Sequence, residues 1–241
     1  MKGFFIMIDG LDGSGKGTVA SGLKQYFESK NKKVFDLREY AKEKHEIPEL
    51  TEINDYDVII SAEPTYAYIG KAIRDEIIRD NGRKYLALST AQAFSLDREI
   101  LYRKLIIPAL EAGKIIIQER GVITSAVYQP VQLEKITLMD ILNLPGNKLA
   151  LKYSPNLLII TQVDPLVVIQ RLKARTEKKD NAIFETLDFQ RKIEERYQSP
   201  WLKQLFESKG SKVVYLNTNA PTTEEDTKKK AIEIIEATLK L

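Results

Sequence analysis

The chain has 241 residues, 43% of them hydrophobic, enough for one large α/β domain or two small ones. The net charge of +3 combines 37 basic and 34 acidic residues, a balance that does not indicate nucleic acid or a membrane as a partner. The absence of cysteine excludes disulfides, thiolate metal sites and a cysteine nucleophile, and the one histidine, His45, lies in a charged stretch expected at the surface. No segment reaches the ~18 apolar residues that span a bilayer, so we expect a cytoplasmic protein.

A glycine-rich turn between a strand and a helix is the first motif of the chain. Residues 4–8 are apolar and predict a buried strand, and apolar residues recur at helical spacing over 19–27. Glycines in the turn allow the backbone to wrap around a ligand, and N–H groups at a helix N-terminus favour an anion. Lys16 adds a charge for a terminal phosphate. The predicted phosphate-binding loop comprises Gly10, Leu11, Asp12, Gly13, Ser14, Gly15, Lys16, Gly17 and Thr18.

This loop departs at one position from the phosphate-binding P-loop pattern G-x-x-x-x-G-K-[ST]. Gly17 stands where Ser or Thr should follow the lysine, and Thr18 comes one residue later. The regular pattern uses that hydroxyl to hold Mg²⁺. We therefore expect the metal to be held through water or by acidic residues elsewhere, with Thr18 as a candidate ligand.

Further apolar segments alternate with helical patterns along the chain. Because the strands are apolar on both faces, we predict one α/β domain, 1–241, with a mostly parallel five-stranded sheet and helices on both faces. Residues 38–56 are predicted as an insertion without secondary structure. The remaining strand-like segments are 33–37, 57–61, 114–118, 156–161 and 212–216; helices are expected at 66–77, 89–112 (bent or restarted near Pro108), 124–129, 134–143, 166–175, parts of 184–206 and around 232–239, with a turn at Pro145-Gly146.

Distinctive polar clusters follow four of these strands. They are the glycine-rich loop, Glu63-Pro64, Glu119-Arg120 and Asp164-Pro165. In open parallel sheets ligands bind beyond the carboxyl ends of the strands. The sequence therefore predicts one ligand site that gathers these four clusters.

Taken together, the clusters resemble thymidylate kinases, within the P-loop nucleoside monophosphate kinases. The resemblance covers residue 2 to about 197 and, more loosely, the last strand and helix. It implies transfer of the γ-phosphate of ATP to dTMP, Mg²⁺ as a cofactor, and a homodimer. The residues that carry it are 5–18, Glu63-Pro64 with Gly70 and Arg74, 94–98, Glu119-Arg120 with 124–129, and Asp164-Pro165 with Arg171 and Arg175.

The resemblance assigns acceptor-binding roles. Asp12 resembles the carboxylate that accepts the sugar 3′-hydroxyl, and Arg74 the arginine that grips the monophosphate. Phe94 and Arg98, four residues apart on one helix face, resemble the pair that stacks on thymine and reads its carbonyl edge; periodicity alone would favour a core phenylalanine and a surface arginine. Tyr128 would pack under the sugar and exclude a 2′-hydroxyl. The predicted substrate-binding set is Asp12, Glu63, Arg74, Phe94, Arg98, Arg120, Thr124 and Tyr128.

The resemblance also assigns catalytic roles. Glu119 stands where the family usually has aspartate, an acid that helps to organise Mg²⁺, so it is the second candidate metal ligand. The region 172–184 resembles a small basic lid, and Gly13 stands where one subclass has an arginine that the other subclass supplies from the lid. The predicted catalytic set is Lys16, Arg120, Arg171, Arg175 and Glu119.

Two departures keep alternatives open. The insertion 38–56 is longer than the family typically has, and Gly17 gives a Gly-Lys-Gly-Thr sequence that looks more like adenylate kinase. The acceptor could therefore be another nucleoside monophosphate or a deoxynucleoside. A non-catalytic nucleotide-binding relative is the alternative from another class.

Overall fold

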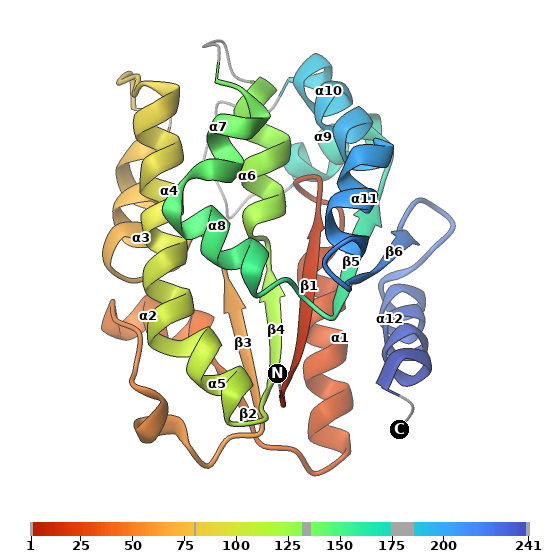
Figure 1. Cartoon of the computed structure of the whole chain (residues 1–241). Coiled ribbons are helices and arrows are strands. Elements are labelled where there is room, and N and C mark those ends of the chain that lie inside the picture. Colours follow the sequence, from red (N-terminus) through yellow and green to blue (C-terminus); the bar gives the residue numbers. More distant parts are fainter. Residues whose placement is uncertain (1, 80, 132–135, 175–185, 240–241) are drawn as a thin grey trace.

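Six parallel strands form a single sheet in the computed structural model, which describes residues 2–79, 81–131, 136–174 and 186–239 (Figure 1). The strand order is β2-β3-β4-β1-β5-β6. The predicted count of five strands is wrong, because all six of the strand-like segments pair in the sheet, including the short edge segment, from Val34 opposite Val58 to Asp36 opposite Ile60. The strands are β1 (Phe4–Gly10), β2 (Val34–Asp36), β3 (Val58–Ala62), β4 (Ile115–Glu119), β5 (Leu157–Gln162) and β6 (Lys212–Asn217).

Helices cover both faces of the sheet, as predicted. Successive side chains of a strand point to opposite faces, so Ile6 and Ile8 pack against α1 (Lys16–Ser29) and α12 (Glu224–Leu239), whereas Phe5 and Met7 face the larger helical layer. The other helices are α2 (Leu37–Lys44), α3 (Tyr68–Ala72), α4 (Ala87–Leu101), α5 (Ile107–Glu111), α6 (Val122–Tyr128), α7 (Leu138–Asn143), α8 (Pro145–Lys152), α9 (Pro165–Ala174), α10 (Leu187–Gln198) and α11 (Pro200–Glu207).

The insertion 38–56 has more structure than predicted. Asp36, the last residue of β2, caps α2 by accepting a hydrogen bond from the backbone N–H of Arg38 at 3.1 Å, so strand passes directly into helix. A 3₁₀ turn follows at Leu50–Ile53. His45 is exposed at the end of α2, as expected.

The prediction made for Pro108 is confirmed, since a new helix starts next to it, whereas the prediction made for Pro145 is wrong. The helix over 89–112 runs on from α4 through a π-helical turn at Tyr102–Ile106 into α5, where Pro108 sits in the first turn, a position that tolerates proline. Pro145-Gly146 is not a turn. Pro145 instead begins α8, because its fixed φ suits the first helical position.

Helices α4 and α8 approach each other closely at Gly146. The Gly146 N–H donates to Ser95 Oγ at 2.9 Å, and a Cβ on Gly146 would lie 1.8 Å from the Ser95 carbonyl oxygen. Only glycine therefore fits this crossing, which fixes α4 against α8.

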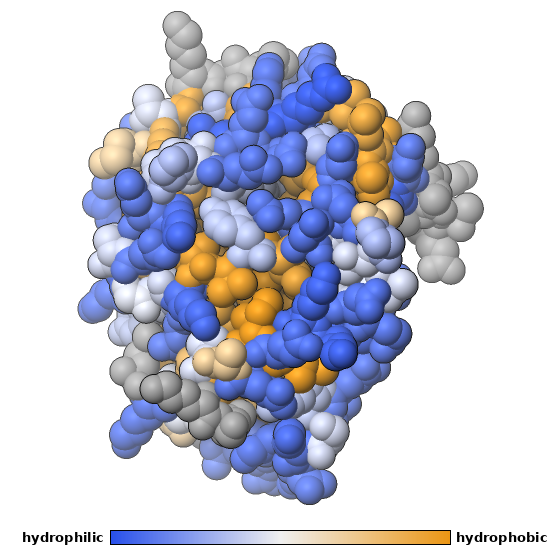
Figure 2. Space-filling view, turned by 90° about the vertical axis from the view of Figure 1, so that its right-hand side faces the viewer, coloured by the Kyte–Doolittle hydropathy of each residue, from blue (hydrophilic) through white to orange (hydrophobic). Residues whose placement is uncertain are grey.

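The side of the molecule that carries β6 and α12 is mostly hydrophilic, with an apolar strip near its middle (Figure 2). β6 is an edge strand, and its Val213 and Val214 are only half-buried. Among the described residues, no helix has the length and apolar character needed to cross a membrane.

Candidate active site

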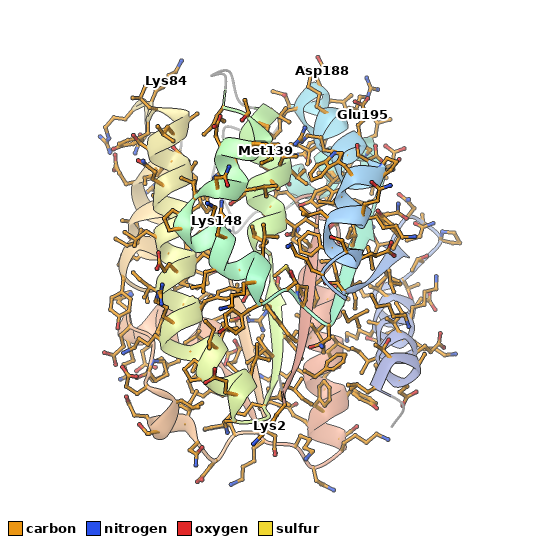
Figure 3. The ribbon with its side chains drawn as sticks, viewed as in Figure 1. Lys2, Lys84, Met139, Lys148, Asp188 and Glu195 are labelled. Atoms are coloured by element: carbon orange, nitrogen blue, oxygen red, sulfur yellow. The ribbon has the colours of Figure 1, made fainter. Side chains whose placement is uncertain are left out.

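All six strands point towards the same end of the molecule, where the predicted polar clusters meet. In Figure 3, Lys84 and Asp188 mark this end and Lys2 marks the opposite one. The glycine-rich loop follows β1, and the clusters at Glu63 and Arg120 follow β3 and β4. The parallel register places Ala62 opposite Glu119, so β3 and β4 end level with each other. On the other side of β4, Ile8 lies opposite Glu119, and β1 runs on to Gly10.

The loop between β1 and α1 has the geometry of an anion-binding turn. Gly13 and Gly15 have φ of 71° and 89°, in the left-handed region that favours glycine, and Gly15 immediately precedes α1. Ser14 Oγ hydrogen-bonds Thr161 Oγ1 of β5 at 2.5 Å, and Thr218 Oγ1 donates to the Ser14 carbonyl at 3.0 Å. Thr161 and Thr218 were not predicted. They tie the loop to β5 and to the segment after β6.

Lys16 is directed back into this loop. Its Nζ donates to the carbonyls of Gly10 at 3.1 Å and Leu11 at 2.6 Å. Burial and the nearby Arg120 charge lower the pKa of Lys16 to about 8. A buried ammonium that donates to carbonyl oxygens is suited to exchange these partners for phosphate oxygens.

Arg120, Asp12 and Tyr128 form a cluster beside the loop. Arg120 Nη2 donates to Asp12 Oδ1, and the Tyr128 hydroxyl donates to Asp12 Oδ2 at 3.3 Å. Burial alone would lower the pKa of Arg120, but the charge of Asp12 raises it overall, so the guanidinium stays charged. Arg120 has a φ of 65°, an unfavourable backbone conformation for a residue other than glycine and one that is often found at functional sites. Asp12 is thus an acceptor for side chains and does more than form a turn.

Thr124, predicted to bind substrate, contacts Asp9. Its Oγ1 donates to Asp9 Oδ2 at 2.7 Å, while the Tyr197 hydroxyl and the Gly10 N–H donate to Asp9 Oδ1 at 2.7 and 2.8 Å. The sequence analysis did not predict Asp9 or Tyr197 as residues of the site. The position of Asp9 at the end of β1 could have indicated it, whereas nothing in the sequence of α10 sets Tyr197 apart.

Arg171 reaches the loop from α9. Its Nη1 donates to the Gly13 carbonyl at 3.1 Å and its Nη2 to the Thr218 carbonyl at 2.9 Å. The lid as predicted, 172–184, begins in the last residues of α9, but Arg175 and the rest of it lie outside the described residues. The lid and the role of Arg175 stay predictions.

Arg98 of α4 is buried and paired. Its Nη2 lies 2.5 Å from Glu63 Oε2 and 3.2 Å from Ser125 Oγ, and its Nη1 donates to Asn147 Oδ1. Gln118 Nε2 donates to Glu63 Oε1 at 2.9 Å. Burial raises the pKa of Glu63 to about 7. The alternative of a surface arginine is excluded, while Phe94, one turn earlier, is half-buried on the same helix.

Arg74 lies under the turn that follows β3. Its Nε donates to the carbonyls of Pro64 at 3.0 Å and Thr65 at 3.1 Å, and its guanidinium lies 3.9 Å from the centre of the Tyr66 ring. Asp97 fixes the same turn from α4, accepting from the Thr65 N–H and hydroxyl, each at 2.7 Å. Arg74 and Asp97 therefore both hold the turn that joins β3 to α3, next to the predicted substrate-binding residue Glu63.

The candidate metal ligands flank the start of α1. A Cβ on Gly17 would lie 4.0 Å from Glu119 Oε2, so this carboxylate faces the position where P-loops carry a hydroxyl, and Thr18 follows it. Within the described residues, no group of three or more acids or histidines forms a cage. Mg²⁺ usually takes one or two carboxylates together with substrate phosphates and water, so Glu119 beside the loop fits this ion.

A glycine-rich loop closed by a buried lysine, at the carboxyl edge of a parallel sheet lined with arginines, defines a P-loop nucleotide-binding enzyme. The sequence model of the thymidylate kinase family matches residues 44–229, and the chain belongs to this family. The match begins after the loop, so the loop itself is identified by its own geometry. Phosphorylation of thymidylate, the activity of the family, is accordingly the activity of this chain.

Individual relatives agree with this assignment. A thymidylate kinase from Caldicellulosiruptor saccharolyticus is 29% identical over 240 residues, covering 100% of this chain and 99% of the relative. A probable thymidylate kinase from Pyrococcus abyssi is 29% identical over 201 residues, or 82% of each chain. The crystal structure of thymidylate kinase from Ehrlichia chaffeensis matches with a TM-score of 0.62 at 19% identity, over 97% of this chain and 98% of that one, and shows the same fold.

Proposed function

We propose that this chain transfers the γ-phosphoryl group of ATP to dTMP, giving dTDP and ADP. The observation that carries the proposal is the convergence of three cations on residues 10–13: Lys16 from α1, Arg120 from the end of β4 and Arg171 from α9. Their partners are loop carbonyls and Asp12, all close to where the loop amides would hold phosphates.

The chemistry is positioning combined with charge stabilisation, and no covalent enzyme intermediate is required. Lys16 and the loop amides hold the phosphates of ATP. Arg120, Arg171 and, by resemblance, Arg175 stabilise the charge on the group in transfer. Thr18 and Glu119 would hold Mg²⁺, which neutralises phosphate oxygens when bound.

The acceptor lies on the other side of Arg120. Asp12 accepts the 3′-hydroxyl, Tyr128 packs under the sugar, and Arg74 binds the monophosphate. Phe94 stacks on the base, whose carbonyl edge turns towards Arg98 beside Glu63. Thr124 contributes through Asp9, since its hydroxyl already donates there.

The test is release of ADP in a coupled assay across dTMP, dUMP, dCMP, AMP and thymidine. We expect the highest kcat/KM with dTMP and, in the Lys16→Ala variant, the loss of activity with every acceptor. A higher kcat/KM for another acceptor would reassign the substrate, and no ADP with any acceptor would make the chain a non-catalytic nucleotide-binding relative.

We also propose a cytoplasmic homodimer. Leu88 and Leu96 are about half exposed and lie eight residues apart, on one side of α4, and Met139 is exposed on the neighbouring α7 (Figure 3). Such an apolar surface favours a second copy as its partner. Light scattering on the purified chain should give twice the monomer mass, and Leu96→Glu should lower it; a monomer at micromolar concentration would refute the proposal.

A further inference from the structure

Arg38, which sequence analysis placed in an insertion without structure, reaches the active site. Its Nη1 donates to Glu119 Oε1. Its Nε and Nη2 donate to the two oxygens of Asp36, at 2.9 and 2.7 Å. Arg38 is therefore held at one end by the edge strand β2 and at the other by the candidate metal ligand.

The contact between Arg38 and Glu119 joins two strands that are not neighbours in the sheet. β3 lies between β2 and β4, so an arginine from the end of β2 has to pass the end of β3 to touch β4. The β3 residue in register with Glu119 is Ala62, which has a small side chain. The end of β2 and the start of α2 thus deliver a side chain to Glu119 at the end of β4.

Asp36 fixes the direction of the guanidinium. It is almost fully buried, caps α2 and also lies 4.0 Å from Lys24 Nζ. A bidentate pair between arginine and carboxylate holds the guanidinium plane in one orientation, which a lysine cannot reproduce. Burial alone would lower the pKa of Arg38, but the hydrogen bond with Asp36 and the charge of Glu119 raise it overall, so the group stays charged.

The two oxygens of Glu119 face different neighbours. Oε1 accepts from Arg38, while Oε2 faces Gly17 at the start of α1. Glutamate is longer than aspartate and has one more torsion to fix, so a second partner is needed to hold its carboxylate in one place. Residues that orient a ligand in this way typically change metal affinity by 10–100-fold when they are removed.

We propose that Arg38 is a positioning residue that holds Glu119 by Oε1 and keeps Oε2 directed at the phosphate loop, where a divalent cation is bound with its nucleotide. The assignment rests on the proposed function only in taking this site to hold a metal–nucleotide complex. Arg38 and Asp36, contributed by the edge of the sheet, then act as one unit with Glu119 at the end of β4.

The test measures binding of Mn²⁺ by electron paramagnetic resonance with ADP present, and binding of ADP alone by calorimetry in EDTA. For Arg38→Ala we expect about 10-fold weaker Mn²⁺ binding, within the range for such residues, and unchanged affinity for metal-free ADP. Asp36→Asn should give a smaller loss in the same direction. Arg103→Ala, which breaks another arginine–glutamate pair, between the π-helical turn Tyr102–Ile106 and Glu99 of α4, is the matched control and should change neither.

A double-mutant cycle separates positioning from a merely structural role. Arg38→Ala should cost nothing further once Glu119→Gln is present, because both changes disable the same carboxylate. Additive losses, or an equal loss of metal-free ADP binding, would overturn the proposal. If Arg38→Ala is too unstable to measure, Arg38→Lys is measured instead. We expect this variant also to bind Mn²⁺ more weakly, and Mn²⁺ binding equal to that of the parent protein would contradict the proposal.

These outcomes are independent of the acceptor. If dTMP is not phosphorylated, the proposed function fails while the Mn²⁺ and ADP titrations still decide the role of Arg38. If dTMP is phosphorylated and Arg38→Ala binds Mn²⁺ normally, the proposed function stands and the positioning role of Arg38 fails.

Discussion

Of the arginine–carboxylate pairs at the carboxyl end of the sheet, Arg98–Glu63 and Arg120–Asp12 differ most clearly in exposure. The side chains of Arg98 and Glu63 are 1% and 3% exposed, whereas those of Arg120 and Asp12 are 20% and 34% exposed. Arg98 also bonds Asn147 and Ser125, while Arg120 stands beside the phosphate loop. The comparison teaches that charge near an active site serves two purposes: the buried pair holds α4 in place, and the accessible pair can exchange its partner for a ligand.

Breaking the buried pair should have the largest effect. Arg98→Met leaves Glu63 buried without its countercharge and should lower the free energy of unfolding by about 3–5 kcal/mol. Urea denaturation measures the loss. Replacing both residues, as Arg98→Met with Glu63→Met, should recover much of it, and a double variant as unstable as the single one would contradict the comparison.

Breaking the accessible pair should affect turnover more than stability. Arg120→Ala removes a donor for the transferred group and should lower kcat by about 10²–10³-fold, the loss typical of one such donor. The melting temperature should change little, because the pair is partly solvated. Arg103→Ala serves as the surface control, and a large fall in melting temperature at preserved kcat would reverse the two roles.

The buried pair should also give stability a pH dependence. Burial raises the pKa of Glu63 to about 7, above its value in the unfolded chain. Between about pH 4.5 and pH 7 the folded state therefore binds more protons than the unfolded state. Stability should therefore fall as pH rises through this window, by at most about 1.4 kcal/mol per pH unit. Glu63→Gln should remove this slope in urea titrations, and an unchanged slope would show that another group produces it.

The smallest effect should be at the phosphate loop, where the binding of ATP should be coupled to the uptake of a proton. The pKa of Lys16 is lowered to about 8, and bound phosphates should raise it, so ATP binding at pH 8 should take up about half a proton. Calorimetry in buffers of different ionisation enthalpy measures this number. Lys16→Arg, which stays charged at this pH, should show no uptake, and equal uptake in both proteins would place the proton elsewhere.

The sequence predicted the parts of the site that local pattern determines. Short stretches of sequence are enough to predict the ends of strands, the glycine-rich loop and the acid or arginine that follows a strand. The positions of Lys16, Glu119 and Arg120 could therefore be predicted from the residues next to them. The segment of β2 was predicted as a strand, although the total was given as five, whereas α2 was missed because its sequence is strongly polar. For α2, tertiary contacts outweigh local preference.

Contacts between distant segments could not be predicted. The pairs Arg38 with Glu119, Tyr197 with Asp9 and Arg98 with Asn147 join residues 81, 188 and 49 positions apart. No local pattern encodes which side chain will meet another across the sheet. One feature of the sequence could have indicated Arg38: it directly follows a predicted strand, as do the four polar clusters that were predicted to form the site.

The close crossing of α4 and α8 at Gly146 lets a segment with no reactive group fix the position of the α4 side chains proposed to face the nucleobase. Any larger residue there would push α4 outwards and carry with it the ring and the guanidinium proposed to face the nucleobase. Drift in acceptor preference among relatives of this enzyme could therefore begin at a helix crossing that never touches the nucleotide.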